Sequence, residues 1–563
     1  MKYDVCIVGS GAGAGPIAYE LSLAGYKVLV LEKGSWYEKE DFFKDEIGVC
    51  RRSTFTPRLD EEQHVIEDIE NGEWIGTPTS ESGWDFWNGN IVGGSSNFMS
   101  GYFHRMKPHD FRLKSEYGEI KGANIVDWPI SYADLEPYYA KVESIVGISG
   151  KVVKHLYQEP RSSPDFPYPS TKEHAISSWF DKACEKQGFT AIPTPRAVLP
   201  YAVEERQGCE YAGYCGSYGC SSGAKGSSRE ALLHKALKTK NLTIQANCFV
   251  KRLRSENSRV KSAEYMDKEG EVHHVDANVF VLSAQAIESS RLLLNSANNE
   301  FPYGLANNSR QVGKNLVFSS GGSGTGEFHY EDLGEQEGKD LNVIGPFVNR
   351  SLQDWYEFQY KDTKEKGGTI DFLFEHPNAV SRARRAMYDG DLVWGDKLKS
   401  RLMHHFKNRR VFTFEVFCDW TPTDDCFVSL DEEIKDKWGM PVAKVRIGYH
   451  EHDLDIGEKL AAKAETLLKE MGARAISSSI SPAPPQNLQA GGCRFGDDPK
   501  TSVLDKNCKA HEVQNLYVSD GSFMPTGGSV PFTWTIYANA FRVADAIMQD
   551  LKTSLGNRQG LKA

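Results

Sequence analysis

The sequence contains no long apolar run. A membrane-spanning helix needs at least about eighteen apolar residues in succession, and no such stretch occurs among the 563 residues. We therefore expect no membrane span in this chain. The first residues, MKYDVCIVGSG, enter a strand-like segment at once and leave no room for a signal peptide. Taken alone, the chain is expected to be cytoplasmic.

Cysteine is also scarce, and acidic residues outnumber basic ones. Eleven cysteines in 563 residues are too few for a disulfide scaffold and fit a reducing compartment. Against 77 Asp and Glu stand 66 Lys and Arg, and the resulting net charge of −11 disfavours nucleic acid or anionic lipid as the main partner. With 40% hydrophobic residues the composition is that of a soluble globular protein, and the length predicts two or more structural units.

The N-terminal segment 3–34, YDVCIVGSGAGAGPIAYELSLAGYKVLVLEKG, is typical of a nucleotide-binding unit. It reads as a buried strand, a glycine turn, a helix and a second strand. Gly9 and Gly11 allow a tight turn and the close approach of a pyrophosphate to amides at a helix N-terminus. Ala14 takes the third position of the GxGxxG pattern, and Glu32 closes the second strand, where a carboxylate can bind ribose hydroxyls. This context favours a dinucleotide ligand over a purely structural turn.

Two later segments repeat the succession of strand and helix. Residues 244–294 contain two strand-like runs before AIESSRLLLNSA, and residues 515–548 place NLYVSD before a long helix. Between them, residues 320–480 alternate aromatic and charged side chains, which favours an antiparallel sheet. The sequence thus predicts an α/β fold with an α+β insertion: a discontinuous Rossmann-like domain and a substrate domain on a mostly antiparallel sheet. The expected segments are 1–315, which includes a cysteine loop at 205–226, then 316–486 for the substrate domain, and 487–563.

Five motifs occur in an order that resembles one enzyme family. The chain is similar to the glucose–methanol–choline oxidoreductases, flavoproteins that bind FAD and usually oxidise alcohols. Within that family, DWPISYADLEPYY at 127–139 and the cysteine loop are most similar to large subunits of bacterial gluconate, sorbitol and glucoside dehydrogenases. The five motifs are the N-terminal fingerprint, NIVGGSSNFMSG at 90–101, AQAIESSRLLL at 284–294, GGCRFGDDPKTSVLD at 491–505 and NLYVSDGSFMPTGGSVPFTWTIYANAFRVADAI at 515–547.

The resemblance implies a set of contacts with FAD. Glycines at 93 and 94 remove steric bulk where backbone amides approach the flavin or pyrophosphate. Asp520 ends a strand where relatives hold the ribityl chain or pyrophosphate, although an Asp at such a place can also cap a helix. Phe98 stands where some relatives carry a histidine linked to FAD, so non-covalent binding is expected. The predicted cofactor-binding residues are Gly9, Gly11, Ala14, Glu32, Gly93, Gly94, Ser95, Asn97, Val250, Asp520, Gly521 and Pro531.

Three of the eleven cysteines gather in GCEYAGYCGSYGC at 208–220. Cys209, Cys215 and Cys220 lack the CxxC pairing of zinc sites and the fourth thiolate of a four-iron cluster. Disulfides or unpaired structural thiols would also account for three cysteines on one loop. Some sugar dehydrogenases of the family carry a three-iron four-sulfur cluster in such a loop. The resemblance therefore implies that these cysteines ligate that cluster and that electrons pass through it to a cytochrome.

The leading hypothesis for function is an FAD-dependent dehydrogenase that moves a hydride from a carbinol carbon of a sugar, polyol or glycoside to flavin N5. Electrons would leave through the iron–sulfur cluster to a protein or quinone. An electron-transfer subunit without alcohol oxidation, or a flavoenzyme acting on another bond, are the alternatives. The resemblance also implies a small subunit and a cytochrome as partners, and export with such a subunit would place the chain in the periplasm.

Two positions depart from the family pattern. In relatives, a segment similar to HxxGTxRMG supplies the histidine that accepts the hydroxyl proton, and here Leu488 takes that position. Val530 replaces the second catalytic group, which is usually Asn or His. Neither side chain accepts a proton, and the neighbouring Gln489 and Ser529 are poor bases. The base is therefore supplied from elsewhere, or alcohol oxidation is altered or lost and glucose and gluconate are poor substrates. Histidines in the relevant half of the chain are His376, His404, His405 and His511.

Overall fold

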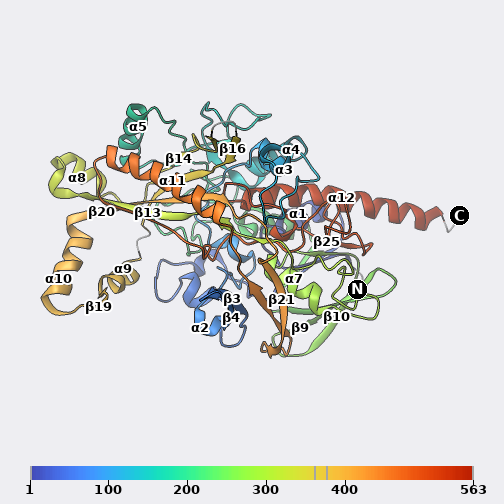
Figure 1. Cartoon of the computed structure of the whole chain (residues 1–563). Coiled ribbons are helices and arrows are strands. Elements are labelled where there is room, and N and C mark those ends of the chain that lie inside the picture. Colours follow the sequence, from blue (N-terminus) through green and yellow to red (C-terminus); the bar gives the residue numbers. More distant parts are fainter. Residues whose placement is uncertain (1–2, 361–362, 376–377, 561–563) are drawn as a thin grey trace.

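The computed structural model describes residues 3–360, 363–375 and 378–560 (Figure 1). Its first large sheet carries the nucleotide fingerprint and has the strand order β7-β2-β1-β10-β9-β8, with β25 pairing β10. β1, β2, β7 and β25 run parallel to the second half of β10, whereas β8, β9 and the first half of β10 form an antiparallel meander. The strands are β1 (Tyr3–Val8), β2 (Val28–Leu31), β7 (Leu242–Gln245), β8 (Phe249–Ser255), β9 (Val260–Met266), β10 (Val272–Leu282) and β25 (Leu516–Val518).

The parallel strands are apolar because both faces of the sheet are covered. All four residues of β2 are buried, as are the last four residues of β1, and such continuous apolar runs are typical of strands between two layers. Helices α1 (Gly15–Leu23) and α12 (Thr533–Gly560) contact each other, and α12 also contacts α4 (Tyr132–Val142). On the meander lies α7 (Ala286–Asn295). These elements enclose the larger hydrophobic core.

The second large sheet is antiparallel, with the order β14-β17-β20-β13-β23 and with β12 pairing β20. Its own core forms where α11 (Glu451–Glu470) packs against the strands, and α5 (Ile176–Gln187) contributes Ile176 and Phe180 to that core. The predicted fold class is thereby confirmed. The strands are β12 (Ser319–Ser320), β13 (Gly322–His329), β14 (Arg350–Leu352), β17 (Thr369–Phe374), β20 (Arg409–Asp419) and β23 (Arg474–Ile480).

A third sheet joins segments that are far apart in the sequence. It has the order β21-β22-β3-β4, and the two segments join where β3 (Val65–Glu70) pairs with β22 (Pro441–Arg446). The outer strands are β4 (Glu73–Pro78) and β21 (Phe427–Lys435). This sheet therefore combines strands of the predicted first segment with strands of the predicted substrate domain. Helix α5 also belongs to the predicted first segment, although it packs in the core of the substrate domain. The boundaries drawn at residues 315 and 486 stay a prediction.

Between β17 and β20 the chain leaves the second sheet and forms a small lobe at one end of the molecule, opposite the C-terminal helix (Figure 1). The lobe consists of α9 (Ala379–Ala386), β18 (Tyr388–Asp389), β19 (Asp391–Leu392), α10 (Gly395–Met403) and the helical turn η8 (His404–Asn408). Among the described residues, no helix is both long enough and apolar enough to cross a bilayer.

Candidate active site

One elongated cavity of about 340 Å³ connects the nucleotide fingerprint with the second sheet. At one end it is lined by the glycine turn after β1 and by Glu32 at the end of β2. At the other end it is lined by Tyr102, Leu488 and two residues of β20, Glu415 and Phe417. The cavity thus begins at the carboxyl ends of parallel strands, where α/β sheets bind nucleotides, and ends against the antiparallel sheet.

The glycines of the turn serve two different purposes. Gly9 has a φ of +90°, and a Cβ added to it would lie 2.3 Å from the carbonyl oxygen of Ser283. A Cβ on Gly13 would lie 2.5 Å from the carbonyl oxygen of Ser519. A Cβ on Gly11, in contrast, would meet no protein atom within 4 Å, because it would project into the cavity. Gly9 and Gly13 are therefore required by packing, whereas Gly11 keeps room for a ligand.

A buried hydrogen-bond chain holds the acid at the end of β2. The hydroxyl of Ser10 donates to Glu32 over 2.6 Å, and the amide of Gly34 donates to the other carboxylate oxygen over 2.7 Å. The amide of Gly93 donates to Ser10 over 2.8 Å. Burial raises the pKa of Glu32 above its ordinary value, and these donors oppose that rise. Ser10 was missed because it occupies a variable position of the GxGxxG pattern.

The loop after β4 closes over the glycine turn. Gly93 and Gly94 have φ values of +93° and +55°, and a Cβ on Gly94 would lie 3.3 Å from Cα of Gly11. Gly94 and Ser95 line the cavity, whereas Gly93 does not. The amide group of Asn97 donates to two carbonyls of this loop, over 2.9 and 3.0 Å, and therefore supports it from behind. Ala14, at the N-cap of α1, is likewise buried outside the cavity lining.

The remaining predicted contacts lie farther along the cavity. Val250, Asp520, Gly521 and Pro531 all line it. Asp520 accepts hydrogen bonds from the Ser289 hydroxyl over 2.5 Å and from the backbone amide two residues later over 2.9 Å, so it also caps the short helical turn that follows β25. Burial raises the pKa of Asp520. Nine of the twelve predicted cofactor residues thus share one cavity.

The two aliphatic replacements occupy different surroundings. Leu488 lines the cavity and has a φ of +59°. Val530 is fully buried in the larger core and lies outside the cavity lining. Gln489 lines the cavity and donates to the carbonyl oxygen of Phe86 over 3.1 Å. Ser529 lies outside the lining, because Lys366 donates to its hydroxyl over 2.8 Å within a buried polar cluster.

Glu415 was not predicted as a site residue, although it faces the cavity beside Phe417. It lies directly opposite Asp371 in the pairing of β20 with β17. No described residue donates a hydrogen bond to its carboxyl group or forms an ion pair with it. Burial, with a smaller contribution from Asp371, raises its pKa to about 7. The signal available in the sequence was an acid flanked by apolar residues in the middle of the aromatic strand RRVFTFEVFCDW.

The cysteine loop packs against the rear of the loop at 93–98. Lys225 is fully enclosed, and its ammonium group donates to the carbonyl oxygens of Asn97 and Cys215, both over 3.0 Å, and of Tyr218 over 2.9 Å. Cys209, Cys215 and Cys220 form no disulfide and are partly buried. Burial raises the pKa of Cys209 to about 12. Burial also acts on Cys220, but the charge of Lys225 lowers its pKa below the ordinary value.

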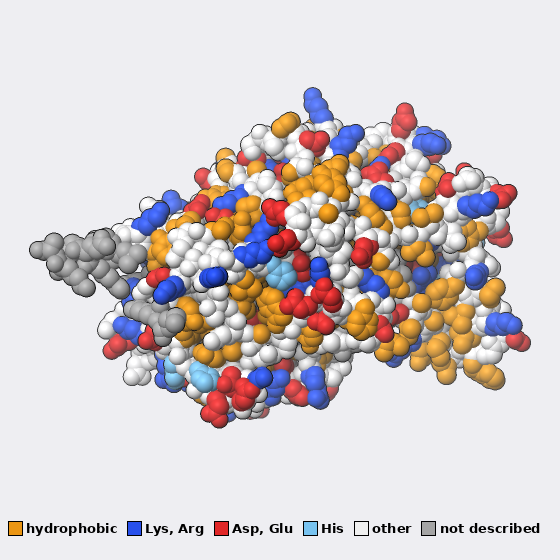
Figure 2. Space-filling view, turned by 180° about the vertical axis from the view of Figure 1, so that it is seen from behind, with side chains coloured by type: hydrophobic (Ala, Val, Ile, Leu, Met, Phe, Trp, Pro, Cys, Tyr) orange, Lys and Arg blue, Asp and Glu red, His pale blue; other side chains and the backbone are white. Residues whose placement is uncertain are grey.

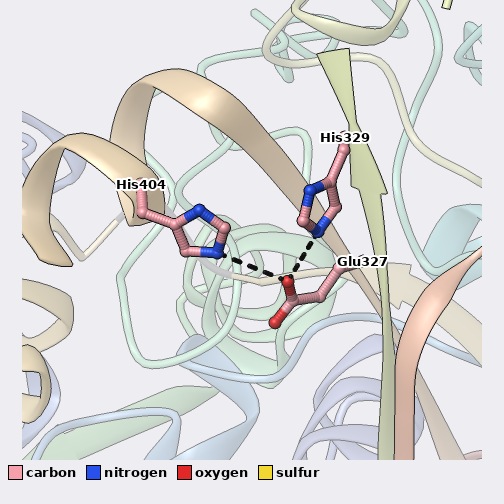
Figure 3. A group of neighbouring side chains, drawn as sticks. All are labelled: Glu327, His329 and His404. Atoms are coloured by element: carbon pink, nitrogen blue, oxygen red, sulfur yellow. Dashed lines mark hydrogen bonds and ion pairs between the residues drawn. The ribbon is translucent and has the colours of Figure 1, made fainter. Parts of the chain in front are cut away.

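The histidines considered as alternative bases lie elsewhere. His404 approaches Glu327 and His329 on the outside of the second sheet, and the ligand atoms of these three side chains lie within 4.8 Å of one another (Figure 3). The carboxylate of Glu327 already forms an ion pair with Arg409. An arginine cation beside the carboxylate makes this an ion-pair network, and we assign no metal to it.

The other three histidines supply no base to the cavity either. His405 contacts Arg382 over 3.1 Å, and His511 contacts the hydroxyl of Ser502 over 3.0 Å. His376 lies outside the described residues. In the part of the chain that the structure describes, the cavity lining contains no histidine. Glu415 is therefore the carboxyl group at the end of the cavity that faces the second sheet.

The Rossmann-like sheet, the ligand space at Gly11 and the cavity that reaches a second sheet define a dinucleotide-binding protein. Sequence profiles of the GMC oxidoreductases match residues 76–319 and 422–540. The chain belongs to this family and is an FAD-dependent enzyme that oxidises CH–OH donors. The family predicted from the five motifs is thereby confirmed.

Individual relatives cover nearly the whole chain. A 2-methyl-1,2-propanediol dehydrogenase of Mycolicibacterium austroafricanum is 30% identical over 97% of this chain and 95% of that protein. The fructose dehydrogenase large subunit of Gluconobacter japonicus is 26% identical over 98% of this chain and 99% of that protein. A crystal structure of pyridoxine 4-oxidase from Mesorbium loti superposes with a TM-score of 0.62 at 18% identity, covering 97% of this chain and 99% of that one. This last likeness concerns the fold.

Proposed function

We propose that the protein is an FAD-dependent dehydrogenase of a sugar, polyol or glycoside. FAD, when bound, supplies the hydride acceptor at N5 of its flavin ring. The glycine turn and Ser10 would hold the pyrophosphate, and Glu32 the adenosine ribose. The absence of a nucleophilic atom at Phe98, a buried side chain stacked on Phe55 at 5.2 Å, supports non-covalent binding.

We further propose that Glu415 accepts the proton of the substrate hydroxyl, in place of the histidine replaced by Leu488. A general base needs a pKa near the working pH and a place within reach of the substrate. Glu415 combines a pKa of about 7 with a position on the cavity wall. Its lack of a hydrogen-bond donor among the described residues leaves the carboxylate available for a substrate. This carboxyl group is the observation that carries the proposal of retained alcohol oxidation.

We also propose that the cysteine loop is the exit for electrons. Cys209, Cys215 and Cys220 would hold a three-iron four-sulfur cluster, which accepts electrons one at a time. The three thiols are partly buried and form no disulfide, which leaves them available as ligands. Lys225 connects this loop directly to Asn97 of the cavity loop. This hydrogen-bonded connection supports the proposal that electrons leave through the cysteine loop to an external acceptor.

The acceptor is proposed to be a small subunit with a cytochrome, or a quinone. The Gluconobacter relative is named as a large subunit, which supports a complex of several chains. A partner that carries an export signal would take this chain to the periplasm.

Anaerobic rapid mixing with sugars, polyols, glycosides and small diols tests the reaction. We expect bleaching of the flavin by at least one polyol or diol on the order of 10 s⁻¹ or faster, and slow bleaching by glucose and gluconate. Failure of the whole panel would favour the alternative, a family member with altered or lost alcohol oxidation. Iron and sulfide analysis with low-temperature EPR tests the cluster separately, and less than about one iron per chain after reconstitution contradicts it.

A further inference from the structure

The lobe formed by residues 379–408, called the basic lobe below, differs in charge from the rest of the chain. It contains seven Lys and Arg against three Asp, whereas the whole chain has a net charge of −11. Arg384, Lys399 and Lys407 are exposed, and none of the three forms an ion pair with a described residue. The basic lobe therefore has a positive net charge, although the net charge of the whole chain is negative.

The same lobe exposes large apolar side chains. The described residues include eighteen large hydrophobic side chains with high exposure, and six of them fall within these thirty residues. Trp394 is 79% exposed, although its indole ring would be shielded in most folded proteins. Figure 2 shows a broad apolar area at the end of the molecule where the lobe lies. The six residues are Val380, Tyr388, Leu392, Trp394, Met403 and Phe406.

The lobe is not needed to complete the sheet from which it departs. Strands β17 and β20 pair with each other over six residues on either side of the excursion, and a short hairpin would connect them. Val393 is the one lobe residue among the described side chains that is buried. A cluster of exposed large apolar side chains within thirty residues marks a site of interaction.

We propose that the basic lobe docks on an anionic lipid surface. Trp, Tyr and Leu side chains enter the interface of a bilayer, while neighbouring Lys and Arg side chains bind anionic head groups. Both kinds of side chain are exposed on this lobe, on elements that lie in one small region. A second copy of the chain is a poorer occupant, because a two-fold axis would bring equal positive charges together.

Docking of this kind is peripheral and requires no spanning helix. It would bring the enzyme to the membrane in which a quinone dissolves, and that consequence rests on the proposed function. The docking itself does not depend on the substrate or on the cysteine loop. A binding test without turnover therefore separates a failure of the docking proposal from a failure of the proposed function.

Flotation of the FAD-loaded full chain with lipid vesicles tests the proposal. We expect binding to vesicles of phosphatidylcholine mixed with phosphatidylglycerol, weaker binding to phosphatidylcholine alone, and loss of binding as salt is added. The variants Trp394→Ser and Arg384→Glu/Lys399→Glu should each lower the affinity about tenfold or more. These side chains are exposed, so the variants should fold and keep the wild-type melting temperature.

Two matched variants provide controls. Leu156→Ser removes a side chain that is 82% exposed outside the lobe, and Lys500→Glu reverses an exposed charge elsewhere. Both should bind vesicles as the wild type does. Binding that is absent, or that the lobe variants leave unchanged, overturns the proposal. If the lobe variants instead lose a co-purifying acidic subunit while vesicles remain unbound, the lobe is a protein-docking site and the lipid assignment is wrong.

Discussion

The ammonium group of Lys225 lies 3.0 Å from the carbonyl oxygen of Asn97, and this hydrogen bond joins the cysteine loop to the loop that closes the cavity. The two residues are 128 positions apart. The same ammonium group binds two carbonyls of the cysteine loop. A single buried cation thus holds the candidate electron exit against the candidate flavin site, although burial lowers the pKa of this lysine.

Replacing Lys225 by Met should loosen both loops together. Three carbonyl oxygens would lose their donor in a buried place, and we expect a loss of about 1–3 kcal/mol in the free energy of unfolding. Hydrogen exchange followed by mass spectrometry should show faster exchange in residues 93–98 and in 209–220. Lys500→Met, at an exposed position, serves as the control. Faster exchange in the cysteine loop alone would contradict the coupling.

Gly11→Ala and Gly13→Ala should have opposite effects. The Cβ on Gly11 enters the cavity and meets no protein atom, so the apoprotein should keep its melting temperature while FAD binds at least about tenfold more weakly. The Cβ on Gly13 would overlap the carbonyl of Ser519, so this variant should lose about 1–3 kcal/mol with or without FAD. Thermal unfolding and flavin fluorescence titration measure the two quantities. Equal effects of both variants on FAD affinity would show that Gly11 does not face the cofactor.

Glu415→Gln should slow flavin reduction by about 10²–10⁴-fold, because an amide cannot accept the proton. In the wild type the rate should rise as the pH passes about 7, since only the ionised carboxylate is a base. The rising limb should be absent in Glu415→Gln. Glu415→Asp keeps a carboxylate, and it should retain the pH dependence at a lower rate. Wild-type reduction rates in Glu415→Gln would exclude this residue as the base.

Asp453→Asn should stabilise the protein at high pH. Burial raises the pKa of Asp453 to about 7, while its carboxylate accepts hydrogen bonds from the amide and hydroxyl of Thr421 over 2.7 and 2.6 Å. Between about pH 4 and 7 the unfolded chain has already lost this proton and the folded chain has not, so wild-type stability falls across that window. Asn removes the titration. Urea unfolding should therefore show an effect of the substitution that is more favourable at pH 8 than near pH 4 by about 4 kcal/mol. A difference that does not vary with pH would show that Asp453 has an ordinary pKa.

The nucleotide site could be predicted from the sequence because its determinants are local. A tight glycine turn between a buried strand and a helix depends on residues only a few positions apart, and Glu32 follows at the end of the next strand. The order of the five motifs added the family, and the replacement of histidine by Leu488 is visible in the letters alone. These features require no knowledge of distant contacts.

The tertiary structure decided which distant side chains meet. Glu415 faces the cavity because one face of β20 forms part of the cavity wall. Val530 is buried in the larger core. Lys225 contacts Asn97 because the cysteine loop packs against the loop at 93–98. Each of these relations joins segments that only the folded sheets bring together, and an alternating strand pattern does not tell which face meets a cavity. The basic lobe shows both contributions. Its charge can be counted in the sequence. The exposure of Trp394 is visible only in the structure, where no described residues pack over this side chain.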